Sequence, residues 1–290
     1  MKKVKKSILV LMFILPAVIP LSIFWIWPMI QAIFMSFTDW DYMSSAYNIV
    51  GTLNYRELFS NSVFYDSLKN TFIFTLGTLI PTIAGGLFIA ILLKKKIKGA
   101  ALYKAIIFSP WVTPTVAISI VWSWIFEPQY GLANYLLQVF NFPKSQWLQS
   151  SDTAMLSIIV VTVWKGVGWA MVFYLTALEK VPKHLYEAAA IDGADARSKF
   201  LNITLPLISP TTFFLSIMTT INSLQAYDQI QVLTQGGPSG STRTILYMYY
   251  QSAFENFDIG KATSMATVIL AIIGLLSGIQ FIASKKWVHY

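Results

Sequence analysis

Lys165 is the one charged residue in the apolar stretch 154–178, and the residues around it are of types that bind polar ligands. Thr162, Lys165, Gly166, Trp169 and Phe173 follow the spacing i, i+3, i+4, i+7 and i+11, so they share one face of a helix. An aromatic ring beside hydrogen-bonding groups suits a sugar, because its C–H face stacks on the ring and its hydroxyl groups form hydrogen bonds. This face is predicted to line a substrate pathway.

A second polar face lies in the apolar stretch 207–228. Thr219, Asn222, Ser223 and Ala226 recur at i, i+3, i+4 and i+7, so they also share a helix face. Serine, threonine and asparagine often hydrogen-bond across neighbouring membrane helices, and for any single residue this structural role remains open beside ligand contact. For the face that carries Lys165 and Trp169, the pathway is the favoured interpretation.

The ammonium group of Lys165 needs a hydrogen-bonding or charged partner at this position in a span. An ammonium group at the centre of a bilayer is unfavourable by about 2.5–3.5 kcal/mol on insertion scales. Three partners are open: backbone carbonyls freed by a proline, a carboxylate from a second subunit, or an acidic substrate such as a uronate-containing oligosaccharide or a sugar phosphate. The side chain could also reach toward one membrane face.

The composition is that of a membrane protein. The chain has 290 residues, of which 56% are hydrophobic and 12% charged, against about 25% charged in soluble domains. The mean hydropathy is +0.59. The absence of cysteine excludes disulfides, iron–sulfur clusters, thiolate zinc and a cysteine nucleophile, and we expect no metal site and no cofactor bound by this chain.

Six apolar stretches are long enough to cross a bilayer. The first follows a lysine-rich start without a small-residue cleavage site, so it is predicted to be retained as a helix. Residues 1–290 are therefore predicted to form a single all-α membrane domain. The predicted spans are 8–34, 71–93, 105–126, 154–178, 207–228 and 262–283.

Basic residues predict the orientation. With both termini in the cytoplasm, 15 of the 21 Lys and Arg residues lie on the inside and 5 on the outside, and Lys165 lies within a span. Excess lysine and arginine mark the cytoplasmic side. The net charge of +8 therefore reports topology and contact with anionic lipid, and it does not indicate nucleic acid as a partner.

The inside segment 179–206 carries the most specific pattern. Pro182 suits a helix start, and that helix is predicted to run to about Ile191. Gly193 then interrupts it, and Asp192 is placed to cap a second short helix through Phe200. The result is an elbow with small alanines and projecting charges, which can insert into a groove of a partner protein.

This segment resembles the EAA loop of permease subunits of binding-protein-dependent ABC importers. The match rests on Glu187-Ala188-Ala189, Asp192-Gly193-Ala194 and Ile203-x-Leu205-Pro206. The resemblance extends along most of the chain and points to the sugar branch, which contains the maltose and glycerol-phosphate permeases. Its further features are Ser36-Phe37-Thr38, Gly51-x-x-Asn54-Tyr55, Asn70-Thr71, Trp164-Lys165-Gly166 and Leu233-Thr234-x-Gly236-Gly237-Pro238.

The resemblance implies the type I ABC importer permease fold in a bacterial cytoplasmic membrane. It implies that Glu187, Ala188, Ala189, Asp192 and Gly193 couple the chain to a dimer of ATP-binding subunits, which would hold ATP and magnesium. It further implies a second homologous permease, an extracytoplasmic binding protein and a carbohydrate substrate. The positions that match sugar contacts in the maltose importer are Thr162, Lys165, Gly166, Trp169, Thr219, Asn222 and Ser223.

Two other classes of function fit the sequence less well. An ion-driven secondary transporter usually places carboxylates in mid-membrane, whereas the nearest acidic residue here is Asp228, at the end of the fifth predicted span. An intramembrane enzyme is not supported, because the chain has no H-E-x-x-H motif, no paired carboxylates in a span and no Walker A sequence. We therefore expect a transport subunit that is not itself an enzyme.

Overall fold

The computed structural model describes residues 2–44, 46–94 and 98–289. All regular elements in these ranges are helices, and one isolated bridge pairs Thr38 with Ile49. Four helices are long and apolar enough to cross a membrane, or up to six spans exist if each of two bent helix pairs counts as one. The all-helical prediction is confirmed for the described residues.

The chain divides into two compact units. The first holds the chain up to Ser62 together with Met248–Leu270. It begins with α1 (Lys2–Leu21), which continues through a π-helical segment at Ser22–Ile26 into α2 (Trp27–Met35). The apolar span Met12–Met35 has none of its residues buried within the chain.

A polar cluster organises the remainder of this first unit. Asn54 in α3 (Leu53–Ser60) is buried and donates hydrogen bonds from Nδ2 to the carbonyl oxygens of Ser36 and Thr38, at 2.9 and 2.8 Å. Lys261, near the start of α15 (Ile259–Ser284), forms an ion pair with Glu57 at 3.1 Å. These contacts tie the segment after α2 to the start of α15.

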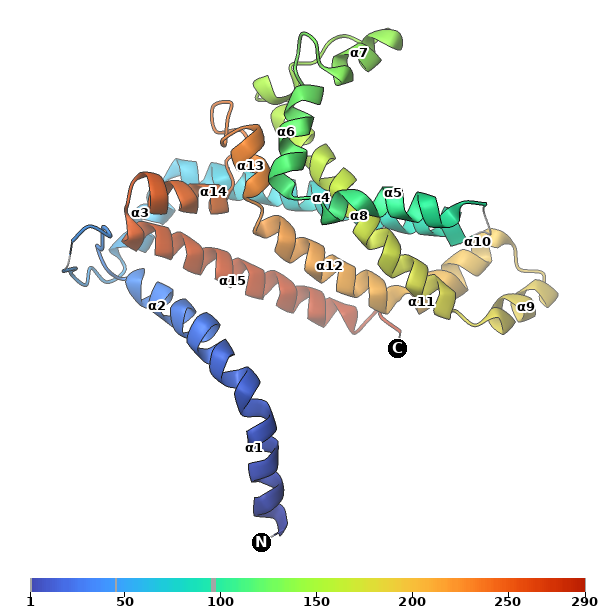
Figure 1. The fold of residues 1–290 in the computed structure, drawn as a ribbon, viewed down its shortest axis with the longest axis horizontal. Helices are drawn as coiled ribbons and strands as arrows, with labels where there is room; N and C mark the ends of the chain where they lie inside the picture. The colour runs from blue at the N-terminus through green and yellow to red at the C-terminus, as the bar shows by residue number, and fades with distance from the viewer. Residues whose placement is uncertain (1, 45, 95–97, 290) are drawn as a thin grey trace. The chain divides into compact units, whose positions relative to one another are not determined.

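The second unit comprises Val63–Tyr247 with the chain from Ala271 onward. Its long helices are α4 (Ser62–Lys94), α8 (Ala154–Lys180) and α12 (Ser209–Leu224). Figure 1 shows how these helices are arranged, and their shared core includes Ala90, Met171, Tyr174 and Leu215. The shorter helices are α7 (Leu132–Val139), α13 (Asp228–Leu233) and α14 (Ile245–Tyr250).

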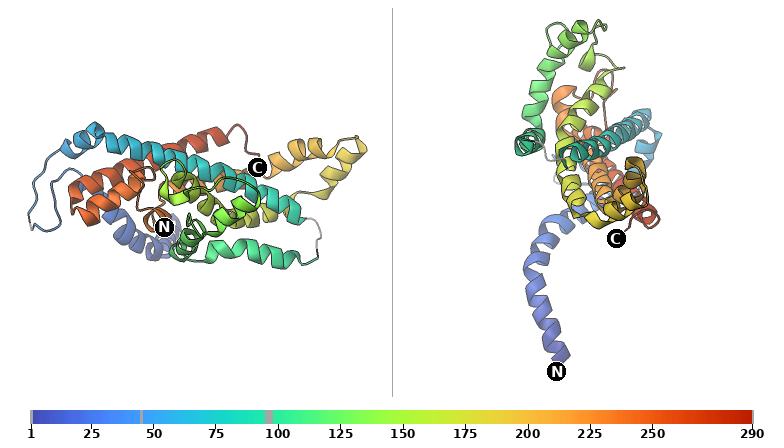
Figure 2. Two further views of the ribbon diagram at one scale, coloured as in Figure 1. Left: turned by 90° about the horizontal axis from the view of Figure 1, so that it is seen from above. Right: turned by 90° about the vertical axis from the view of Figure 1, so that its right-hand side faces the viewer.

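Helix α8 lies between α4 and α5 (Ala100–Val112), as the two views of Figure 2 show. Glycine permits both close approaches. A Cβ atom on Gly86 would lie 2.5 Å from the Cβ of Ala170, and one on Gly168 would collide with the carbonyl oxygen of Ile107. The absence of side chains at these two positions lets α8 pack closely against both neighbours.

The third predicted span, 105–126, is not one straight helix. It consists of the end of α5 and all of α6 (Thr115–Ile125), which meet at an angle of 101°. Thr113 is extended, with φ −78° and ψ 138°, as expected for a residue before a proline. Pro114 has no backbone N–H to continue the helix, so the chain turns here.

The fifth predicted span, 207–228, also differs from the structure. Residues Ala196–Leu207 and Ser209–Leu224 meet at 63°, between Pro206 and Pro210. Helix α12 ends at Leu224, and Asp228 begins α13. The other four predicted spans fall on α1–α2, α4, α8 and α15, whose helices extend beyond them by up to about nine residues, within the length that tilt allows.

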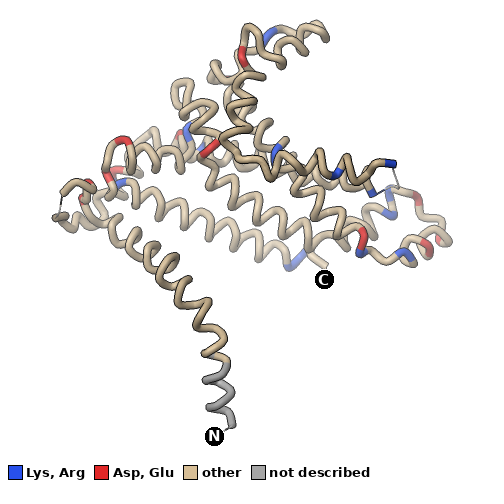
Figure 3. Tube along the Cα trace, in the orientation of Figure 1, with Lys and Arg blue, Asp and Glu red and all other residues tan. Residues whose placement is uncertain are grey.

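The elbow joins α8 to α12. It comprises α9 (Lys183–Ile191), α10 (Ala196–Lys199), a π-helical turn at Phe200–Thr204 and the short α11 (Leu205–Leu207). Figure 3 shows charges of both signs gathered on it, whereas the long helices are almost free of charge.

One predicted detail of the elbow is wrong. Asp195, not Asp192, caps the second helix, because its carboxylate accepts a hydrogen bond from the Ser198 backbone N–H at 2.7 Å. Asp192 instead ends α9, and two further residues complete the turn before the cap position. Gly193 has a φ of +79°, which confirms that it forms the turn.

Candidate functional site

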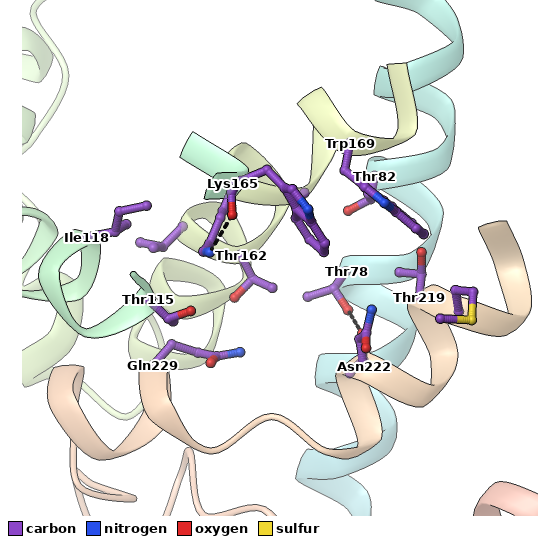
Figure 4. A pocket seen from close by; sticks show the side chains of 15 residues that line it. Thr78, Thr82, Thr115, Ile118, Thr162, Lys165, Trp169, Thr219, Asn222 and Gln229 are labelled. Atoms are coloured by element: carbon purple, nitrogen blue, oxygen red, sulfur yellow. Dashed lines mark hydrogen bonds between the residues drawn. The ribbon is translucent and has the colours of Figure 1, made fainter. Parts of the chain in front are cut away.

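A cavity of about 420 Å³ lies within the second unit, between α4, the α5–α6 corner, α8 and α12 (Figure 4). Its volume is in the range of small-molecule sites. The structure brings all seven predicted pathway residues to this one cavity. They are Thr162, Lys165, Gly166, Trp169, Thr219, Asn222 and Ser223.

Hydroxyl groups form much of the wall. Thr78 on α4 and Ser223 on α12 share a hydrogen bond of 2.7 Å between their side-chain oxygens, so Ser223 joins two helices as well as lining the cavity. Thr162 donates to the carbonyl of Ile158 in its own helix, at 2.8 Å. Among the described residues, the buried hydroxyl of Thr219 has no hydrogen-bond partner.

That unpartnered hydroxyl is informative. A buried polar atom without a partner is costly, and Thr219 borders the cavity in Figure 4. A rotation about its Cα–Cβ bond would be needed to turn this hydroxyl, which has almost no accessible surface, toward a ligand or a water molecule in the cavity. Asn222, one helical turn along α12, is exposed and offers both a donor and an acceptor.

Lys165 finds its partners in the backbone. Its Nζ donates to the carbonyl oxygen of Thr113 at 3.0 Å and to that of Trp111 at 3.3 Å. The ammonium also lies 5.6 Å from the centre of the Trp111 ring, within cation–π range. Of the three partners that the sequence left open, the structure shows the carbonyls beside a proline.

Aromatic rings continue from the cavity along α8. Trp111 and Trp169 are stacked, with centroids 5.1 Å apart and planes at 20°. Trp169 then meets Phe173 at 5.1 Å, and Phe173 meets Phe214 of α12 at 5.2 Å. Phe173 shares the predicted face but does not line the cavity; it extends the aromatic row beyond it.

Several lining residues were not predicted. A usable signal existed for α4, where Thr71, Thr75, Thr78 and Thr82 recur at intervals of four, three and four residues, and all four are buried. No comparable periodic signal existed for Trp111 and Thr115. They reach the cavity because the chain turns between them, and only the three-dimensional corner brings them there. The other unpredicted lining residues are Ile118, Val161, Met218 and Gln229.

The elbow is exposed rather than enclosed. Glu187, Ala188, Asp192 and Gly193 are exposed and Ala189 is half-buried. The apolar side chain of Ile191 is 87% exposed. The elbow therefore presents both charged and apolar side chains at its surface.

The base of the elbow is anchored to the bundle. The hydroxyl of Tyr186 shares a hydrogen bond of 2.8 Å with that of Thr204, and Lys94 at the end of α4 lies 5.2 Å from the Tyr186 ring centre. In the part of the chain that the structure describes, no group of three His, Asp or Glu side chains could hold a metal ion.

These features define a class: a multi-pass helical membrane protein with a polar cavity among broken helices and a charged elbow at one end. Residues 82–289 match the family described as binding-protein-dependent transport system inner membrane component. The chain belongs to this family, and is an ABC transporter permease subunit.

Individual relatives agree along the whole length. The probable ABC transporter permease protein YurN of Bacillus subtilis is 32% identical, with 95% of this chain and 96% of that protein covered. The multiple sugar-binding transport system permease protein MsmF of Streptococcus mutans is 33% identical, with 95% and 94% covered. The sn-glycerol-3-phosphate transport system permease protein UgpA of Agrobacterium fabrum is 30% identical, with 98% and 97% covered.

The fold has solved counterparts. A chain of a bacterial alginate ABC transporter, crystallised in complex with an alginate pentasaccharide-bound periplasmic protein, superposes with a TM-score of 0.84. The alignment covers 98% of this chain and 96% of that chain at 22% identity. The type I ABC permease fold and the permease family that the sequence resembled are thereby confirmed.

Proposed function

We propose that this chain is the transmembrane subunit of an ATP-driven importer for a carbohydrate, most simply an oligosaccharide, that an extracytoplasmic binding protein delivers. The observation that carries the proposal is the cavity, where hydroxyl and amide groups from α4, α8 and α12 face the Trp111–Trp169 stack. The relatives named for sugar and glycerol-phosphate transport support the choice of substrate class.

The elbow supplies the second half of the proposal. Its exposed Glu187, Asp192 and Ile191 would dock onto an ATP-hydrolysing subunit, which would bind ATP and magnesium itself. One chain offers one elbow, so a dimeric motor requires a second permease, taken here to be a distinct homologue. The whole chain would act as one membrane domain with six spans, each bent helix pair counting as one span, and with both termini in the cytoplasm.

The competing class is an ion-driven transporter. Such proteins use intramembrane carboxylates as ion or proton relays. In the described part of the chain, none of the cavity-lining side chains is a carboxylate. This composition favours coupling to ATP through the elbow over coupling to an ion gradient through the cavity.

Reconstitution tests the proposal directly. The permease pair and its ATPase would be placed in liposomes, with ATP inside and the binding protein and a radiolabelled oligosaccharide outside. We expect uptake that requires ATP and the binding protein and is unchanged by an ionophore that collapses ion gradients. Uptake that persists without ATP and disappears with the ionophore would reassign the chain to the ion-driven class.

A further inference from the structure

The α5–α6 corner exposes backbone carbonyls that the helix no longer satisfies. The last four carbonyl groups of a helix have no partner within it, and Pro114 removes a further donor. The Thr113 hydroxyl donates a hydrogen bond to the carbonyl oxygen of Ser109, at 3.0 Å. The Ile118 backbone N–H donates to the carbonyl oxygen of Pro114, at 3.2 Å, at the start of α6. The carbonyls of Trp111 and Thr113 also lie at this corner.

The carbonyls of Trp111 and Thr113 both accept hydrogen bonds from one side chain. The Nζ atom of Lys165 on α8 lies 3.3 Å from the Trp111 oxygen and 3.0 Å from the Thr113 oxygen. One ammonium group therefore binds two carbonyls at the C-terminal end of α5, one within the helix and one at the residue just after it, and it comes from a different helix. Among the described residues, no carboxylate lies within ion-pair distance of it.

The bridge also sets the position of an aromatic ring. The Lys165 ammonium lies over the Trp111 ring, which in turn stacks on Trp169, four residues after Lys165 on α8. Trp111 and Thr115 are both cavity-lining residues that flank the break. The wall that α5 and α6 contribute to the cavity thus depends on how the corner is held against α8.

We propose that Lys165 is a positioning residue for transport: its ammonium fixes the α5–α6 corner to α8 by binding the carbonyls of Trp111 and Thr113. This inference rests on the proposed transport function for its consequence, but its geometry does not depend on the substrate. It also assigns the charge of Lys165 to the protein's own backbone rather than to an acidic substrate. Two of the three N–H donors of the ammonium are already used at the corner.

Hydrogen–deuterium exchange on the purified, assembled transporter tests the positioning step. Lys165→Met keeps the length and flexibility of the side chain and removes its donors. We expect the amides of residues 111–118 to exchange about ten-fold faster or more, the effect of losing charge-assisted hydrogen bonds. Lys165→Arg, which retains donors that can reach carbonyl oxygens, should return exchange close to the wild-type rate.

Thr162→Val is the matched control. Thr162 lines the same cavity from the same helix, but its hydroxyl bonds to its own backbone and does not touch the corner. Exchange in residues 111–118 should be unchanged in this variant. If Lys165→Met does not assemble, Lys165→Gln provides the same comparison, because its neutral amide keeps two donors and should give an intermediate exchange rate.

Uptake kinetics test the consequence for transport. If Lys165 positions the corner, Lys165→Met should lower the maximal uptake rate, leave half-saturation by loaded binding protein unchanged, and be rescued by arginine. An unchanged exchange rate at the corner in Lys165→Met, or an arginine variant no better than methionine, would overturn the proposal.

The two proposals fail in different ways. A loss of uptake in Lys165→Met confined to a uronate-containing trisaccharide, with a neutral trisaccharide unaffected, would make Lys165 a counter-ion for the substrate and contradict the positioning role. A transporter that carries no carbohydrate at all would remove the proposed function, but the exchange result would still decide whether Lys165 holds the corner.

Discussion

The cavity and the elbow belong to the same unit of the chain and are joined by α8. Their side chains differ in that those of the cavity bond to neighbouring helices, whereas those of the elbow are exposed. In the cavity, Thr78, Ser223 and Lys165 bond to neighbouring helices of the same chain. In the elbow, Glu187 and Asp192 are exposed. The base of the elbow is fixed by the hydrogen bond between Tyr186 and Thr204.

This difference indicates whether the side chains of each site are held by contacts within this chain or by contacts that a partner would supply. The cavity is lined by side chains of this one chain and is formed by packing within it. The elbow presents charges and an 87% exposed isoleucine, which the ATPase would cover under the proposed function. Variants of the elbow should therefore change assembly, whereas variants of the cavity and its supports should change stability or substrate handling.

The largest expected effect comes from reversing the charge at the elbow. Glu187→Lys should reduce co-purification of the ATPase by more than about ten-fold, because truncation alone of a buried charged contact costs about 2–5 kcal/mol. Stimulation of ATP hydrolysis by the binding protein should fall with it. The chain itself should insert and fold normally, since Glu187 is exposed.

Glu179→Lys serves as the control for that variant. It makes the same charge reversal at an exposed position near the end of α8, before the elbow. ATPase binding should stay near the wild-type level. Equal loss in both variants would show that net charge matters and not the elbow contact, and wild-type binding in Glu187→Lys would refute the docking role.

The next largest effect is on stability, and it tests the close packing of α8 against α5 beside the cavity. Gly168→Ala would place a methyl group against the backbone carbonyl of Ile107, and forcing α5 away from α8 should cost about 1–3 kcal/mol. Thermal unfolding of the purified chain in detergent measures it. Gly278→Ala is the matched control, because an added Cβ there meets no described atom within 4 Å.

A smaller effect is expected at the turn of the elbow. Gly193 has a φ of +79° and open space around it, so a substitution acts only through backbone conformation. Gly193→Val should strain the turn by about 1–2 kcal/mol and lower binding-protein-stimulated ATP hydrolysis. Gly193→Asn should be much milder, since asparagine tolerates this conformation; identical behaviour of the two variants would contradict the argument.

The sequence predicts which residues share a helix face, but it does not predict at which residue a helix breaks. The periodicity of Thr162, Lys165 and Trp169 predicts a shared face, because residues three and four apart meet on any helix. Hydropathy predicts an apolar stretch at 105–126, but it does not indicate that two helices within this stretch meet at an angle. The turn at Thr113 and Pro114 is a property of the backbone, so Trp111 and Thr115 could not be assigned to the cavity beforehand.

The same distinction applies to capping. Asp192 and Asp195 are both acceptable cap residues by type, and the choice between them depends on how many residues the Gly193 turn uses. In the structure the cap lies three residues later than predicted, at Asp195. Lys165 shows the converse case: its need for a partner was predictable from its charge, but the identity of that partner depended on the corner.

The smallest expected effect sharpens the comparison inside the cavity. Thr219→Val removes the buried hydroxyl that lacks a partner among the described residues, and keeps the shape of the side chain. The stability of the empty chain should change by less than about 0.5 kcal/mol, because no hydrogen bond to the protein is lost. If the hydroxyl bonds to the substrate, uptake efficiency should fall by about two- to ten-fold.

Ser223→Ala is the comparison, since it breaks the bond with Thr78 and should lower the stability of the empty chain by about 1 kcal/mol. A Thr219→Val variant with wild-type uptake would assign that hydroxyl to cavity water and leave Asn222 as the polar contact on α12.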